Sequence, residues 1–109
     1  ELVICIIANH WQGEYVWTVH TRACVKLGIP QSVFDAIRAG REPELDDERE
    51  RTVYDLTRSA MEPGAGSDEV FDRAERLLGR NGIAEVLALL GYYSAVAMAV
   101  KLHRVPLPT

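Results

Sequence analysis

The sequence predicts an all-α bundle of about six helices, and three observations lead to this fold class. Apolar residues recur at helical spacing in successive segments, glycines and prolines separate these segments, and no segment is convincing as a strand. The chain has 109 residues, the size of one domain, and its 48% hydrophobic and 26% charged residues are typical of a globular protein. We therefore expect one helical domain over residues 1–109.

The first segment, residues 1–9, is an apolar run rich in β-branched side chains. Such a run suits a buried strand as well as a buried helix, and its periodicity does not decide between them. Because no other segment is predicted to be a strand, a lone strand would have no partner, and we predict the end of a helix. The abrupt apolar start also leads us to expect a further N-terminal segment before Glu1. A break over residues 9–13 follows, where Gly13 tolerates unusual dihedral angles.

Three helices are predicted in the middle of the chain. Residues 14–27 begin with Glu14, whose carboxylate complements the positive end of a helix dipole, and Gly28 follows as a left-handed C-cap. Residues 30–39 form a short helix. A charged linker then leads to a helix over residues 45–60, which opens with acidic residues and carries a narrow apolar stripe.

Two helices are predicted in the last part of the chain. A break at residues 62–66 and an N-cap at Ser67 precede the first, and residues 79–82 separate it from the second. The second helix, residues 83–102, is apolar on nearly every side and must be covered on every side. In so small a domain this requires another subunit. Because Glu85 and other polar residues interrupt the apolar run, we expect the centre of an oligomeric bundle and not a membrane span.

Charge and cysteine content restrict the class of protein. A net charge of −4 argues against non-specific nucleic-acid binding, which depends on clustered lysine and arginine. Cys5 and Cys24 show neither CxxC nor metal-ligand spacing, so we predict free thiols, no metal and a reducing cytoplasm. A signal peptide would show a basic region followed by an apolar run, and the sequence has none, so we predict no signal peptide. We therefore expect a cytoplasmic protein with neither nucleic acid nor membrane as a partner.

Two stretches together, residues 1–28 and residues 90–108, resemble the carboxymuconolactone decarboxylase family. The superfamily of this family also contains the AhpD-like alkylhydroperoxidases, and the order of helices is similar along essentially the whole chain. The resemblance implies an AhpD-like all-α fold and a homo-oligomer, either a dimer, a trimer or a hexamer. The true decarboxylase removes a carboxylate from a small lactone diacid without a cofactor, so the resemblance also implies that no cofactor is needed.

The thiol branch of that superfamily carries a glutamate, two cysteines and a histidine at fixed spacing. In this sequence the glutamate and histidine positions fall on Glu1 and His20, whereas the cysteine positions fall on Gly13 and Val16. A thiol peroxidase needs a peroxidatic thiolate with a resolving thiol close by. The resemblance therefore implies that the acid–base residues are present and the redox pair is absent, which disfavours peroxiredoxin-type or alkylhydroperoxidase-type activity.

His20 is the predicted catalytic residue, a general acid or base that acts with the carboxylate of Glu1 or Glu14. On a helix Glu14 lies about 240° around from His20, so it would join a site from another direction, for example across a subunit boundary. The alternative for His20 is a buried histidine satisfied by hydrogen bonds. The candidate substrate-binding residues are aromatic or imidazole side chains: Trp17, His10 and Tyr92.

Three hypotheses follow for the function. The first is a cofactor-independent lyase acting on a small carboxylated or lactone substrate, whose carboxylate Arg22 or Arg104 would hold. The second is a thiol or peroxide activity in which His20 activates Cys24, although a small buried hydrophobe is the alternative for this cysteine. The third is a non-catalytic oligomer that binds a small ligand.

Overall fold

The computed structural model describes residues 1–62 and 68–107, and no strand is present among them. The helices are α1 (Leu2–His10), α2 (Glu14–Lys26), α3 (Gln31–Arg38), α4 (Glu48–Met61) and α5 (Asp68–Leu102). The predicted all-α class is therefore confirmed for this part of the chain. The predicted N-cap at Ser67 and residues 63–66 of the predicted break lie outside the described residues.

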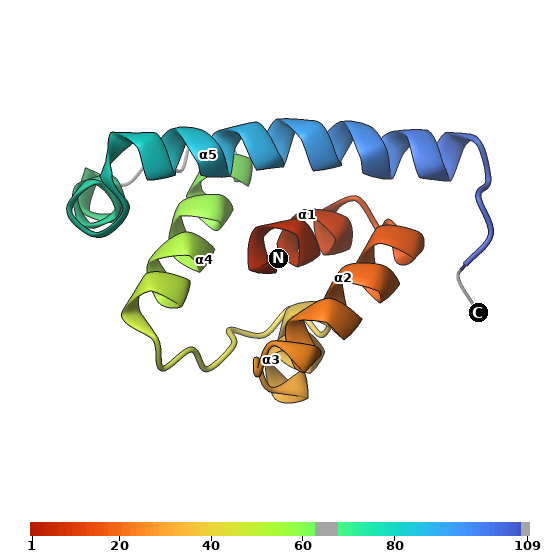
Figure 1. The fold of residues 1–109 in the computed structure, drawn as a ribbon, viewed down its shortest axis with the longest axis horizontal. Coiled ribbons are helices and arrows are strands. Elements are labelled where there is room, and N and C mark those ends of the chain that lie inside the picture. The colour runs from red at the N-terminus through yellow and green to blue at the C-terminus, as the bar shows by residue number, and fades with distance from the viewer. Residues whose placement is uncertain (63–67, 108–109) are drawn as a thin grey trace.

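Helix α1 lies at the centre of the fold, with α2, α3, α4 and α5 all packed against it (Figure 1). Residues 2–8 of this helix are all buried. An apolar surface on every side suits this position, because each side of the helix faces another helix. The helix predicted over residues 1–9 is therefore confirmed, and the strand alternative is wrong.

The end of α2 follows from its local sequence. Gly28 adopts φ +100°, in the left-handed region that glycine enters without strain. The N–H of Ile29 then donates to the carbonyl of Cys24, with 3.1 Å between nitrogen and oxygen. This bond satisfies one of the carbonyls that a helix end leaves free, so the predicted left-handed C-cap is confirmed.

Helix α4 begins at Glu48, three residues later than its predicted start at residue 45. Asp47 is the reason, because its side chain caps the helix. Asp47 Oδ1 accepts hydrogen bonds from the backbone N–H groups of Arg49 and Glu50, at 2.8 and 3.0 Å. An aspartate at this position satisfies N–H groups that have no partner within the helix, so it sets where the helix starts.

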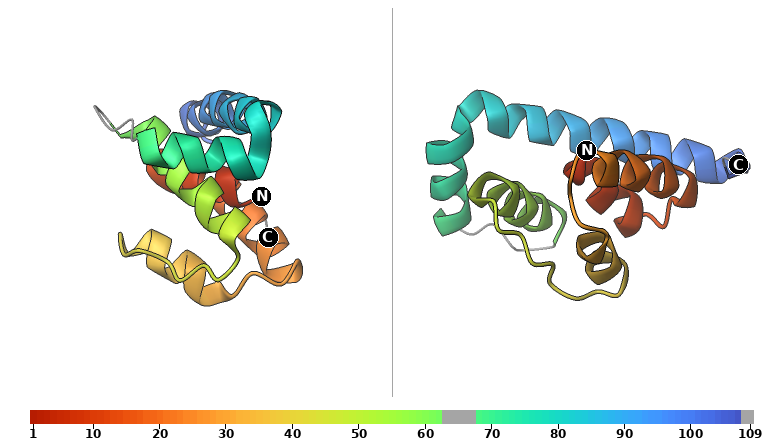
Figure 2. Two further views of the ribbon diagram at one scale, coloured as in Figure 1. Left: turned by 90° about the vertical axis from the view of Figure 1, so that its left-hand side faces the viewer. Right: turned by 60° about the horizontal axis from the view of Figure 1, so that its bottom comes forward.

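Helix α5 contains a sharp bend at Gly79, whose non-helical dihedral angles, φ 73° and ψ 169°, separate two helical segments. Figure 2 shows the first segment turned away from the long second one. The predicted separation over residues 79–82 is thus confined to one residue, and this is why five helices are observed in the described chain where about six are predicted. Gly82 permits the tight corner, since a Cβ there would lie 2.8 Å from Leu78 Cβ.

The long second segment of α5 is covered on one side only. Its buried residues pack towards the rest of the domain, whereas large apolar side chains elsewhere on it are exposed, namely Leu87, Tyr92, Met98 and Leu102. By length and composition α5 is also the one helix of the described chain that could cross a membrane, a test that core helices of soluble proteins pass as well. The oligomer and the absence of a membrane partner therefore stay predictions.

Candidate functional site

The side chains of Glu1 and His20 meet where α1 and α2 pack together. Nδ1 of His20 lies 2.7 Å from Oε2 of Glu1, which is hydrogen-bond and ion-pair distance. Glu1 is the residue before α1 and His20 lies in the middle of α2, so helix packing brings them together. Of the two carboxylates considered for His20, the structure thus places Glu1 beside it.

The surroundings of His20 leave its other ring nitrogen free. The His20 side chain is 19% exposed, and its ring meets the ring of Tyr93 edge-on, with 5.3 Å between the centroids. Nε2 of His20 has no hydrogen-bond partner among the described residues. A histidine held by a carboxylate at one nitrogen and free at the other has the arrangement that proton transfer requires.

Glu14 is engaged elsewhere. The two terminal nitrogens of the Arg38 guanidinium donate to the Glu14 carboxylate, at 2.6 and 2.9 Å. The same guanidinium lies 4.4 Å from the centroid of the Trp17 ring, which in turn meets the ring of Phe34 edge-on. Within one chain, Glu14 and Trp17 therefore connect α2 to α3, and the polar contacts of Glu14 do not include His20.

The other predicted binding residues are dispersed. His10 ends α1 and lines a separate cavity of about 220 Å³. Tyr92 is 64% exposed and approaches His20 only through Tyr93, whose ring it meets edge-on at 5.0 Å between centroids. Their roles in substrate binding stay predictions.

The two cations proposed to hold a substrate carboxylate are not at Glu1. Arg22 is exposed on α2, and Arg104 lines cavities beside the last turns of α5 together with Lys101. Neither arginine is among the residues that line the cavity beside Glu1.

This cavity beside Glu1 has a volume of about 480 Å³ and lies between α1, α4 and α5. Most of its wall is aliphatic, including Leu2, Val3, Ile29, Val53, Val86 and Leu89. Its charged lining consists of Glu1, Glu50, Glu85 and Arg49. His20 does not line it, so Glu1 is the residue that connects this cavity to the imidazole.

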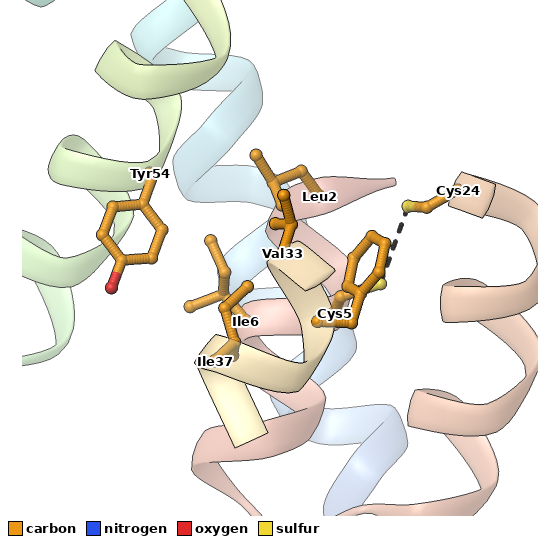
Figure 3. Packing of buried hydrophobic residues seen from close by; sticks show 8 residues of the cluster. Leu2, Cys5, Ile6, Cys24, Val33, Ile37 and Tyr54 are labelled. Atoms are coloured by element: carbon orange, nitrogen blue, oxygen red, sulfur yellow. Dashed lines mark hydrogen bonds between the residues drawn. The ribbon is translucent and has the colours of Figure 1, made fainter. Parts of the chain in front are cut away.

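Cys5 and Cys24 also meet, with 3.7 Å between their sulfur atoms, and both are completely buried (Figure 3). Cys5 lies one helical turn after Glu1, and Cys24 lies one turn after His20. The sulfur contact thus repeats the Glu1–His20 contact one turn further along both helices. The sequence led us to expect free thiols and not this contact, although the equal spacing of nineteen residues in both pairs was a signal that could have predicted it.

The contact between the two thiols shifts their pKa values in opposite directions. The hydrogen bond to Cys24, together with burial, raises the pKa of Cys5. The hydrogen bond from Cys5 lowers the pKa of Cys24, because it stabilises the Cys24 thiolate. The partner of Cys24 in the structure is therefore Cys5 and not His20.

No group of three or more histidine, cysteine, aspartate or glutamate side chains within residues 1–62 and 68–107 is arranged to hold a metal ion. Compared with known protein families, with curated proteins and with solved structures, the chain matches none of them. The resemblance to the carboxymuconolactone decarboxylase family therefore stays a prediction from the sequence.

Proposed function

We propose that the chain is a cofactor-independent lyase that uses general acid–base catalysis on a small carboxylated or lactone substrate. The observation that carries this proposal is the 2.7 Å contact between His20 Nδ1 and Glu1 Oε2. A carboxylate at Nδ1 holds the ring in one tautomer and one orientation. Glu1 lines the cavity beside it and His20 does not, so a proton passes between His20 and the substrate through this carboxylate.

In the proposed reaction, the bond between the substrate's carboxylate carbon and its ring breaks, and carbon dioxide leaves. The electron pair of that bond stays on the substrate, where conjugation with the lactone carbonyl stabilises it. The His20 imidazolium passes its Nδ1 proton to Glu1, Glu1 donates a proton to the resulting carbanion, and the neutral imidazole regains a proton from water. This sequence involves no oxidant or reductant, so it requires neither a redox thiol pair nor a cofactor.

The cavity beside Glu1 supports a more specific substrate class. Its aliphatic walls suit the body of a small organic molecule. Arg49 is the guanidinium in its lining, whereas Glu1, Glu50 and Glu85 contribute carboxylates. Because carboxylates repel a further anion, this balance favours a lactone with a single carboxylate, held at Arg49, over a diacid. Arg49 thereby takes the anchoring role that the sequence suggested for Arg22 or Arg104.

The decisive experiment measures carbon dioxide release from a panel of lactone monocarboxylic acids. His20→Ala should reduce the rate by about 10²–10⁴-fold, the range for loss of a general acid or base. His103→Ala is the matched control, because His103 is exposed after the end of α5 and should leave the rate unchanged. An unchanged rate in His20→Ala would refute the proposal.

Two further variants separate the alternatives. Arg49→Gln should raise KM with little change in kcat, as expected for loss of a binding contact. Cys24→Ala should retain the lyase rate, whereas a thiol activity that depends on Cys24 would be lost in this variant.

We also propose that α5 packs against further copies of the chain. The exposed residues Leu87, Tyr92, Met98 and Leu102 support this assembly, since a single domain leaves them in water. Covering apolar side chains of this size with a second surface lowers the free energy of the protein in water.

A further inference from the structure

We infer that Cys5 and Cys24 form a reversible disulfide that joins α1 to α2. Both are free cysteines in this structure, and their sulfur atoms are 3.7 Å apart, compared with about 2.05 Å in a disulfide bond. Side-chain rotation and a small shift of the helices can close a gap of this size. The inference goes beyond the proposed function and does not depend on it.

The pairing is selective because each cysteine has one possible partner within the chain. The sequence contains two cysteines, and both lie in one buried cluster with Leu2, Val33 and Phe34 (Figure 3). Burial of both sulfurs disfavours a bridge between chains, since a second chain cannot reach either sulfur without opening the cluster.

A path for a small oxidant leads through the cavity beside Glu1. Leu2 belongs to the buried cluster and Ile29 packs against it, and both residues also line the cavity. The cavity and the buried cluster that holds the sulfurs therefore share these two aliphatic side chains. Movement of these two side chains would admit a molecule of the size of hydrogen peroxide to the sulfurs.

The chemistry balances with hydrogen peroxide as the oxidant. Cys24 reacts first as the thiolate, since its pKa is the lowered one of the pair. Its sulfur attacks one peroxide oxygen, the O–O bond breaks, and the departing oxygen takes a proton and leaves as water. Cys5 then attacks the sulfenic acid sulfur, so that the S–S bond forms, the S–O bond breaks and a second water leaves with the Cys5 proton. Two thiols and one peroxide thus give one disulfide and two waters.

The bridge would hold together the two helices that carry the candidate site. It would lie one helical turn from the Glu1–His20 contact on both α1 and α2. It would also close a loop from residue 5 to residue 24, which restricts the unfolded chain. For a loop of this length in a domain of this size, we expect the oxidised protein to melt roughly 5–15 °C above the reduced protein.

The first experiment identifies the bridge. Reduced protein is treated with one equivalent of hydrogen peroxide, unfolded with N-ethylmaleimide present, and digested with trypsin without reductant. We expect the peptide that ends at Arg22, which contains Cys5, to be linked to the peptide Ala23–Lys26, which contains Cys24. The protein should lose the mass of two hydrogen atoms, remain a single chain on a non-reducing gel, and regain both thiols with dithiothreitol.

The second experiment tests whether the native packing favours the bridge. The equilibrium between thiols and disulfide is measured in buffers of reduced and oxidised dithiothreitol, with the protein native and in concentrated urea. We expect the disulfide to be favoured by about tenfold or more in the native protein, because folding holds the sulfurs together. An equal or smaller equilibrium constant in the native protein, or a bridge found between chains alone, would overturn the inference.

Single variants provide the control. Cys5→Ala and Cys24→Ala each keep one thiol, so peroxide should neither remove two hydrogens nor raise the melting temperature of either protein. A rise in either variant would show that the stabilisation comes from another reaction. If neither variant folds, the comparison of the wild-type protein in native buffer and urea still decides the question.

Discussion

Replacing Phe34 with alanine is the substitution we expect to destabilise the protein most clearly. The Phe34 side chain is completely buried on α3, in the cluster that contains Cys5 and Cys24. Its ring also meets that of Trp17 edge-on, with 6.2 Å between centroids. This cluster joins α1, α2, α3 and α4, so the substitution tests the packing that brings Glu1 to His20.

The magnitude follows from the burial of this ring. Truncating a buried phenylalanine to alanine costs about 3–5 kcal/mol, which combines lost apolar burial with the cavity left behind. Because three helices surround the site, we expect limited collapse into this cavity and a loss of about 3–4 kcal/mol. A domain of this size has about 5–15 kcal/mol of stability in total. The melting temperature should therefore fall by roughly 15–25 °C.

Urea denaturation, followed by tryptophan fluorescence and by circular dichroism, measures this loss. Phe71→Ala is the matched control, because Phe71 is 44% exposed on α5 and its truncation should cost less than about 1 kcal/mol. Equal losses in the two variants, or a loss below about 1 kcal/mol for Phe34→Ala, would refute the packing described for this cluster.

Three other predictions concern the thiols, the exposed helix and the link between α2 and α3. The pKa of Cys5 is raised in the folded protein, which keeps a proton that the unfolded chain loses above about pH 8.5. The free energy of unfolding should thus fall by up to about 1.4 kcal/mol per pH unit above that value, and urea titrations should show this slope in the wild type but not in the double variant Cys5→Ala, Cys24→Ala. Leu87→Glu should reduce the molar mass in light scattering to that of one chain, and a wild type that is already monomeric would contradict the proposed oligomer. Arg38→Lys should cost about 0.5–1 kcal/mol in urea denaturation because lysine cannot make both bonds to Glu14, and Arg38→Lys combined with Glu14→Gln should cost no more than either alone.

Helix ends were predictable from the sequence where a local cause sets them. The C-cap at Gly28 depends on a glycine and the hydrogen bonds of neighbouring residues, so a short stretch contains the whole cause. The corner at residues 79–82 was predicted less well. Gly79 alone leaves the helical region, and Gly82 remains helical because its missing Cβ makes room for Leu78. Whether a glycine breaks a helix or permits close packing depends on neighbours that a sequence pattern does not show.

In the candidate site, one side-chain contact was predicted from the sequence and another was not. The motif resemblance suggested Glu1 for His20, and the structure places these two side chains together. The partner of Glu14 was not predicted, because Arg38 is twenty-four residues away and meets it only through the packing of α3 on α2. Which side chains of two helices meet depends on the angle and the offset at which the helices pack. Amphipathic periodicity specifies neither quantity.

The most apolar helices differ in how the fold covers them, and this difference bears on assembly. From the sequence we expect residues 83–102 at the centre of an oligomeric bundle, whereas α1 lies at the centre of the single chain. Four helices are enough to cover a helix of nine residues, whereas the longer apolar segment of α5 has other helices on one side only (Figure 1). Helices of the same chain therefore bury the apolar surface of α1, whereas part of the apolar surface of α5 stays exposed. A second copy that presents its own α5 would cover this exposed part with the same surface on both sides, as a two-fold symmetric interface does.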